Sequence, residues 1–329
     1  MIKIGWKAGI EQHQPDTLLD LAVIAEQAGF KTIDVSDHFH PWSEDGSCAF
    51  TWTWLGAALS KTQKIELGTG ITCPILRYHP SIIAQAAATV GYMAPNRFYL
   101  GVGTGEALNE YSAVGIWPGY NDRQAMLKES IDLMRQLWTG KEIKFAGEFY
   151  QTKKAKLFTV PPKLIPIYVS TMVPNSAFFA GEYGDGMITV GGQKPEVYKE
   201  MLKNFATGAK KAGKNPQTMP KLIEINASYT DDKNEAIEVM KKYWAGTFVI
   251  ALFDQKIYTP KMSAQNGEVI GADMIEQKTL ISTKPKDHVD YIKHYSDLGF
   301  THLYIHFVGK DEGAMLREYG KHVLPKFTI

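Results

Sequence analysis

The sequence predicts an α/β protein that folds as a (β/α)8 TIM barrel. Short runs rich in Ile, Val, Tyr and Phe recur along the 329 residues, with amphipathic segments between them. The runs are almost continuously hydrophobic, as expected of parallel strands covered on both faces. No change in composition divides the chain, and barrels of this length commonly form one domain, so we expect a single domain over 1–329. A doubly wound open sheet is the alternative, but no GxGxxG motif opens a helix after the first run.

Eight runs are expected to form the strands of this barrel. They are IKIGWKA from Ile2, TIDVSDH from Thr32, IELGTGI from Ile65, FYLGVGTG from Phe98, PIYVSTM from Pro166, GMITVG from Gly186, LIEINASYT from Leu222 and HLYIHFV from His302.

The segments between the runs have the period of amphipathic helices. In Thr17–Ala28 the apolar residues share one face, Asp16 is expected to cap the helix, and Gly29 is expected to end it. The same pattern predicts helices over Ser81–Met93, Arg123–Trp138, Glu196–Ala212, Asn234–Trp244 and Asp287–Leu298.

Two stretches interrupt this alternation. Residues 139–165 are expected to form an added hairpin and loop, and residues 247–282 an irregular insertion that carries Lys256, Lys261 and Lys278.

Composition argues against several classes of function. The formal net charge of +1 predicts neither a nucleic-acid interface nor binding to an anionic membrane surface. No run approaches the roughly 18 apolar residues of a membrane span, and the N-terminus shows no signal-peptide pattern. The two cysteines, Cys48 and Cys73, are expected to be reduced, because a chain of this length does not need a disulfide to hold its core. We therefore expect a cytoplasmic protein.

Active sites of such barrels lie at the C-terminal ends of the strands. This rule selects Glu11 after the first strand, the SDHFHPW segment after the second, and GTGEALNE, with Glu106, after the fourth. A histidine facing a glutamate across a pocket suits proton transfer coupled to a redox or elimination step.

Each motif also has a simpler interpretation. GTGEALNE is a poor phosphate loop, and its glycines could serve only to turn the chain from strand to helix. His38 and His40 could bind zinc together, but no third ligand is apparent, so we expect no metal site. His40 alone is expected to pack or to face solvent.

SDHFHPW, TCPILRYHPSIIAQAAAT, NRFYLGVGTGEALNE and LMRQLWTG together resemble the bacterial-luciferase-like superfamily. Within it, the chain is similar to the enzymes that use the deazaflavin coenzyme F420, namely the glucose-6-phosphate dehydrogenases and the secondary alcohol dehydrogenases. The resemblance extends along essentially the whole chain, and it implies a TIM barrel with luciferase-like insertions and coenzyme F420 at its C-terminal face.

The resemblance also implies roles for individual residues. His38 and Glu106 would be the catalytic pair that handles protons, with the division of roles between them open, and Trp42 would shape the pocket. A non-proline cis peptide would join Gly70 to Ile71. The remaining expected coenzyme contacts are Asp37, Thr72, Cys73, Thr104, Gly105, Asn109, Met172, Val173, Asn175 and Ser176.

The substrate is less well defined by the resemblance. Cations that grip phosphate in the sugar enzymes would correspond here to Gln193, with Lys194 alongside, and to Lys256 and Lys278, while a threonine near the sugar would become Val190. Glu11 is also assigned to the substrate side. The expected donor is a sugar or sugar 6-phosphate that gives a hydride to the coenzyme. A secondary alcohol, a flavin-dependent monooxygenase reaction or a non-catalytic deazaflavin-binding role are the alternatives, and a homodimer is expected.

Overall fold

A computed structural model describes residues 2–249 and 256–327 of the chain. Parallel strands pair around a closed ring in the order β1-β2-β3-β4-β5-β6-β7-β9 and back to β1. The predicted (β/α)8 barrel is therefore confirmed. The strands of the ring are β1 (Lys3–Ala8), β2 (Thr32–Val35), β3 (Glu66–Thr69), β4 (Phe98–Val102), β5 (Ile167–Ser170), β6 (Gly186–Val190), β7 (Lys221–Ser228) and β9 (His302–Phe307).

The sheet has one strand more than the eight that the sequence predicts. The additional strand, β8 (Thr279–Ile281), pairs in parallel with the last residues of β7, from Asn226 to Ser228. It lies outside the ring, because it pairs with β7 beyond Glu224, where the pairing of β7 with β6 has ended, while β9 still pairs with β7 up to Ala227. A strand of three residues is too short to show a hydrophobic period of its own.

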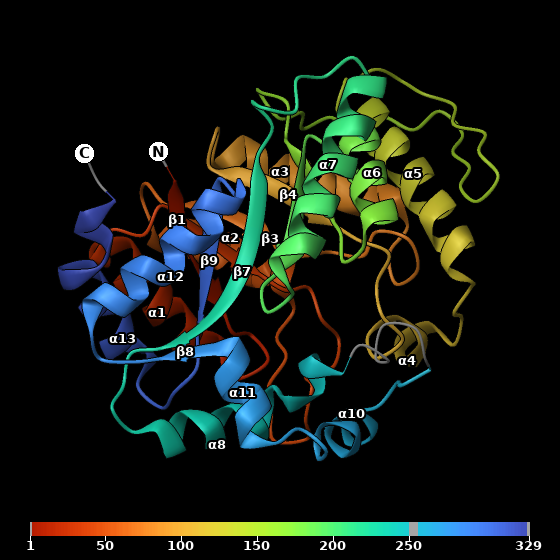
Figure 1. Cartoon of the computed structure of the whole chain (residues 1–329). Coiled ribbons are helices and arrows are strands. Elements are labelled where there is room, and N and C mark those ends of the chain that lie inside the picture. Colours follow the sequence, from red (N-terminus) through yellow and green to blue (C-terminus); the bar gives the residue numbers. More distant parts are fainter. Residues whose placement is uncertain (1, 250–255, 328–329) are drawn as a thin grey trace.

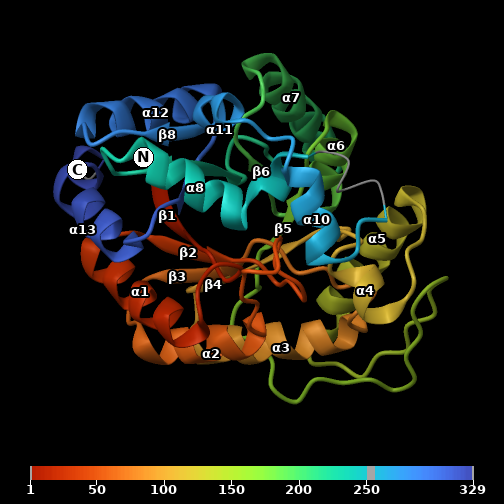
Figure 2. The ribbon, with the colours of Figure 1, turned by 90° about the horizontal axis from the view of Figure 1, so that it is seen from below.

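Helices surround the ring (Figure 1). In Figure 2, α1, α2 and α3 lie along one side of the barrel and α12 and α7 along the opposite side. The helices that follow the barrel strands are α1 (Pro15–Ala28), α2 (Thr51–Lys61), α3 (Pro80–Met93), α4 (Glu110–Val114), α5 (Tyr120–Leu137), α6 (Pro174–Tyr183), α7 (Pro195–Lys211), α8 (Lys233–Tyr243), α12 (Pro285–Leu298) and α13 (Glu312–His322). The six predicted helices are all present, whereas α2, α4, α6 and α13 are not among them.

The start of α1 corrects one expectation. The helix begins at Pro15, with Gln14 as its N-cap, so Asp16 lies in the first turn and does not cap it. Proline is favoured at this first position, since it has no N–H that would lack a partner there. The predicted end is confirmed, because Gly29 adopts φ +99° and its N–H bonds back to the last turn.

Residues 139–165 contain the predicted hairpin, whereas the described part of 247–282 has more regular structure than the sequence predicts. In 139–165, antiparallel bridges join Ile143 to Ala155 and Ala146 to Gln151, which supports the predicted hairpin. In 247–282, residues 250–255 lie outside the described part, and the rest forms the end of η1 (Ala245–Phe248), then α10 (Pro260–Gly267), α11 (Ala272–Lys278) and β8. Figure 1 shows α8, α10 and α11 gathered at the end of the barrel where β7 leads into β8.

The interior of the barrel is apolar at one end and charged at the other. Tyr99, Tyr168 and Tyr304 fill the N-terminal half together with Ile188 and Leu222. Towards the C-terminal ends of the strands, inward-facing charged side chains replace them. Both cysteines are free thiols, and no helix among the described residues is long and apolar enough to cross a membrane.

Candidate active site

His38 is held between two carboxylates at the C-terminal end of the barrel. Its Nδ1 lies 2.7 Å from Oε1 of Glu11, which follows β1, and its Nε2 lies 3.2 Å from Oε1 of Glu106, which follows β4. The side chain of Glu11 is 1% exposed, whereas those of His38 and Glu106 are 12% and 13% exposed. The Nε2 side of the imidazole therefore faces the more open part of the site.

Electrostatics favour the protonated form of His38 and the ionised form of Glu11. Burial opposes a charge on His38, but Glu11 and then Glu106 outweigh it and raise the pKa of His38 to about 10. Burial likewise opposes a charge on Glu11, but the facing imidazole and Lys7 lower its pKa to about 2. The pair is thus an ion pair at neutral pH, with Nδ1 committed to Glu11.

Two residues hold this group in place. The ring of Trp42 meets that of His38 edge to face, with 5.5 Å between centroids. The side-chain oxygen of Asn109 accepts from the backbone N–H of Phe39 at 2.7 Å and of His40 at 2.9 Å, and its Nδ2 donates to Glu106 at 3.3 Å. Asn109 therefore ties the loop after β2 to the loop that carries Glu106.

Asp37 also holds the loop after β2 in place. Its carboxylate accepts from Trp52 Nε1, Thr72 Oγ1 and Tyr78 Oη, at 3.2, 3.0 and 3.0 Å. Arg77 donates to the carbonyl oxygen of Asp37 and forms an ion pair with Glu110 at 2.9 Å. Asp37 is 2% exposed and these hydrogen bonds give it a supporting role in the loop, while its expected contact with the coenzyme stays a prediction.

The other residues expected at the coenzyme gather after β3, β4 and β5, which are neighbours in the sheet. Thr104, Gly105, Met172 and Ser176 are half-buried and Val173 and Asn175 are exposed, so they line an open surface. Thr72 and Cys73 are buried, and the backbone N–H and carbonyl of Thr72 bond to Gly101 and Gly103. Ser176 Oγ bonds to Thr171 and receives the N–H of Val173 at the start of α6.

The backbone has unusual geometry at two glycines in the loops after β3 and β4. The peptide between Gly70 and Ile71 is cis, as the sequence resemblance implied. Gly105 has φ +72°, and a Cβ there would lie 2.6 Å from Cys73 Sγ and 2.8 Å from Cγ of Glu110. A side chain at position 105 would therefore strain the backbone and displace its neighbours.

The residues expected at the substrate are brought together only in part. Lys278 packs over Gly192, where a Cβ would meet its side chain at 3.3 Å, so it lies beside Gln193. Val190 is 36% exposed at the end of β6. Lys194 is exposed at the N-cap of α7, and Lys256 lies 5.1 Å from the ring of Tyr111. Glu11 is buried on the Nδ1 side of His38, where it can support the imidazole. Its expected contact with the substrate stays a prediction.

Two charged residues near the site, Lys7 and Arg77, were not predicted from the sequence. Lys7 projects from β1 into the barrel and pairs with Asp34 of β2 and Glu224 of β7, each at 3.2 Å. Arg77 lies in a quoted motif but was not singled out. A buried lysine in an otherwise apolar strand was the signal that could have identified Lys7.

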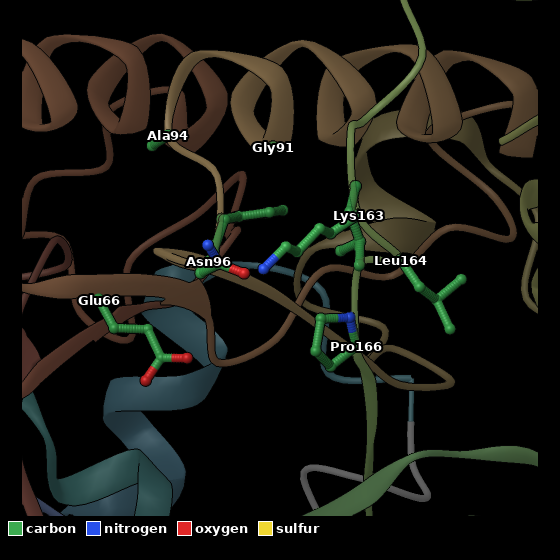
Figure 3. Close-up of a pocket in the computed structure, with 9 residues that line it drawn as sticks. Glu66, Gly91, Ala94, Asn96, Lys163, Leu164 and Pro166 are labelled. Carbon is green, nitrogen blue, oxygen red and sulfur yellow. The ribbon is translucent and has the colours of Figure 1, made fainter.

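The protein also has a cavity away from this site. A cavity of about 230 Å³ lies at the opposite end of the barrel, where Glu66 begins β3, Phe98 begins β4 and Pro166 precedes β5. Figure 3 shows Lys163 and Asn96 pointing toward one another there. In the part of the chain that the structure describes, no three His, Cys, Asp or Glu side chains are grouped as metal ligands.

Comparison with known proteins identifies relatives of the whole chain. Residues 2–302 match the family model described as luciferase-like monooxygenase. An F420-dependent glucose-6-phosphate dehydrogenase of Nakamurella multipartita is 38% identical over 99% of this chain and 96% of its own. One of Mycolicibacterium gilvum is also 38% identical, over 99% and 98%. A solved F420-dependent secondary alcohol dehydrogenase, in complex with an F420-acetone adduct, is 36% identical, covers 98% of each chain and superimposes with a TM-score of 0.94.

Proposed function

The chain belongs to the luciferase-like monooxygenase family, and from this premise we propose that it is a coenzyme F420-dependent dehydrogenase acting on CH–OH donors. The observation that carries the proposal is the contact of His38 with both Glu11 and Glu106 at the C-terminal rim of the barrel. The relatives that share the whole length of the chain are F420-dependent dehydrogenases.

The residues present fit a bound deazaflavin. Oε2 of Glu106 is buried and makes no hydrogen bond within the described residues, so it has capacity for a ligand. The loops after β3, β4 and β5 form a wall without side chains at Gly103 and Gly105, where a Cβ would meet neighbours within 3 Å. The start of α6 adds backbone N–H groups, which suit an anionic part of a ligand. When bound, coenzyme F420 would supply the carbon that accepts a hydride.

His38 is placed to accept the hydroxyl proton of the donor. Because Nδ1 faces Glu11, only Nε2 is directed toward the open site, and Glu106 also reaches this atom at 3.2 Å. Once the imidazole is neutral, which its pKa near 10 makes more frequent as pH rises, a donor hydroxyl that binds between Nε2 and Glu106 would give its proton to Nε2 as the carbonyl forms. Trp42 packs against the ring and keeps its plane fixed. Glu106, with its unpartnered oxygen, would hold or deliver a proton on the coenzyme side.

We propose a sugar or sugar 6-phosphate as the donor. Lys278 lies beside Gln193 at the rim of β6, where it can act as a point charge for a phosphate group. A secondary alcohol is the second candidate. The largely apolar cluster of Trp42, Leu108, Trp244, Ile257 and Val308, in which Trp42 contacts His38, favours it because such a wall suits an apolar alcohol.

Absorbance of the oxidised coenzyme tests the proposal. The protein is mixed with coenzyme F420 and, separately, glucose, glucose 6-phosphate or isopropanol. Loss of the absorbance with at least one donor is expected, and the donor that reacts decides between the two substrate classes. A parallel titration with FMN tests the flavin alternative, because a monooxygenase would quench tryptophan fluorescence with FMN and leave the deazaflavin unreduced.

We also propose that the protein works in the cytoplasm and as a homodimer, with small molecules as its only ligands. Relatives that are glucose-6-phosphate dehydrogenases, together with the formal net charge of +1, support the small-molecule part of this proposal.

A further inference from the structure

Lys7 connects four strands of the barrel through one ammonium group. Its side chain is 4% exposed. Nζ lies 3.2 Å from Asp34 on β2 and 3.2 Å from Glu224 on β7, and it donates to the carbonyl oxygen of Gly70, just after β3, at 2.6 Å. The ammonium group therefore makes one hydrogen bond, to the carbonyl oxygen of Gly70, and two ion pairs, with carboxylates on β2 and β7.

The interior around Lys7 carries more acid than base. Asp34 and Glu224 contact it directly, burial raises the pKa of Asp34 to about 7, and Glu11 is close enough for Lys7 to help lower its pKa. His306 on β9, 3.8 Å from Glu224, adds no positive charge at neutral pH, because burial lowers its pKa. When His38 is neutral, Lys7 is the cation among the described residues that faces the ionised Glu224 and Glu11, while Asp34 is partly protonated near neutral pH.

We propose that Lys7 is a positioning residue that sets how tightly His38 holds its proton. The inference rests on the proposed function, in which His38 is the base. An unpaired buried carboxylate takes up a proton readily. When His38 is neutral, Glu11 has lost the charge that faces it, and Lys7 keeps it ionised. Without Lys7, the surplus negative charge would bind the imidazole proton more tightly.

A purely structural role makes a different prediction. If Lys7 only joins strands, loss of Lys7 or of its partner Glu224 should lower stability and activity without moving a pKa. If its charge acts on His38, the two losses should move the pKa of His38 in opposite directions. The charges that face His38 itself, Glu11 and Glu106, are retained in both variants.

The test compares Lys7→Gln and Glu224→Gln with a control, Glu312→Gln. Glu312 is a buried carboxylate that accepts from Trp6 Nε1 and contacts His13, on the outer side of β1. The control therefore removes a buried charge whose partners, Trp6 and His13, are neither Lys7 nor His38.

The primary readout is the pKa of His38 from NMR of labelled histidines in the coenzyme-free protein, with His38→Asn to assign the signal. Lys7→Gln is expected to raise this pKa by about one unit and Glu224→Gln to lower it by a similar amount. Glu312→Gln is expected to leave it unchanged. The pH at which kcat/KM for donor oxidation reaches half its plateau should move in the same directions.

Shifts of the same sign in both interior variants, or no shift in either, would overturn the proposal. If Lys7→Gln does not fold, Glu224→Gln decides, since a lowered pKa supports the charge role and an unchanged one contradicts it. The proposed function is tested separately, and it is contradicted if the wild-type protein reduces no coenzyme with any donor. In that case the NMR titration still tests the effect of Lys7 on the pKa of His38.

Discussion

Replacing Glu11 by Gln should convert His38 into a weaker base. The Glu11–His38 contact of 2.7 Å is buried, with side chains 1% and 12% exposed. At this distance the Coulomb energy at an effective dielectric constant of about 20 is roughly 6 kcal/mol, which is an upper bound. Hydrogen bonds to charged groups contribute about 1.5–3 kcal/mol net, and 1.36 kcal/mol corresponds to one pKa unit. The pKa of His38 should therefore fall by about one to two units from its value near 10.

The assay is the pH dependence of kcat/KM for oxidation of the donor. The acidic limb reports the base of the free enzyme, so it should move to lower pH by about one to two units in Glu11→Gln. The plateau kcat should fall about tenfold, because a weaker base removes the proton less effectively. Glu11→Asp keeps the charge and serves as the control, with a limb closer to that of the wild type. An unmoved limb in Glu11→Gln would show that Glu11 does not set the basicity of His38.

Three further results are expected. The pKa of His38 is raised, so donor oxidation, which needs the neutral imidazole, should increase as pH rises toward about 10, and carbonyl reduction should decrease over the same range; a common optimum for both directions would contradict this assignment. Asn109→Ala leaves two loop N–H groups without their acceptor and should lower the free energy of unfolding by about 1–3 kcal/mol, as measured by urea titration, together with kcat. Gly105→Ala should weaken F420 binding at least about tenfold, since a Cβ would lie 2.6 Å from Cys73 Sγ at positive φ, and unchanged affinity in a fluorescence titration would argue against this wall as the coenzyme site.

The barrel could be predicted from the sequence because its strands are covered on both faces and so appear as continuous apolar runs. The rule that active sites follow barrel strands also placed His38 and Glu106 on one rim, and the structure puts them in contact. His38 follows β2 and Glu106 follows β4, and both strands are neighbours of β3, so strand order places the two loops at one rim. Their pairing as catalytic groups was what the family resemblance implied.

The role of Glu11 and Lys7 could not be predicted in the same way. Which side of the imidazole a carboxylate occupies depends on side-chain directions that strand order does not specify. Lys7 and Glu224 are distant in the sequence and meet only because the barrel closes between β7, β9 and β1. Helix α2 (Thr51–Lys61) was missed because its first residues, TWTW, are typical of strands, and packing against α1 overrides that preference.

Transfer of a deuterium label tests the central claim most directly. The donor that reduces the coenzyme is prepared with deuterium at its carbinol carbon and reacted with oxidised coenzyme F420 and wild-type protein, and the reduced coenzyme is examined by mass spectrometry. A dehydrogenase in which His38 takes only the hydroxyl proton predicts one deuterium on the coenzyme carbon that accepts the hydride. Reduced coenzyme without the label, or oxygen incorporated into the product, would contradict direct hydride transfer at this site.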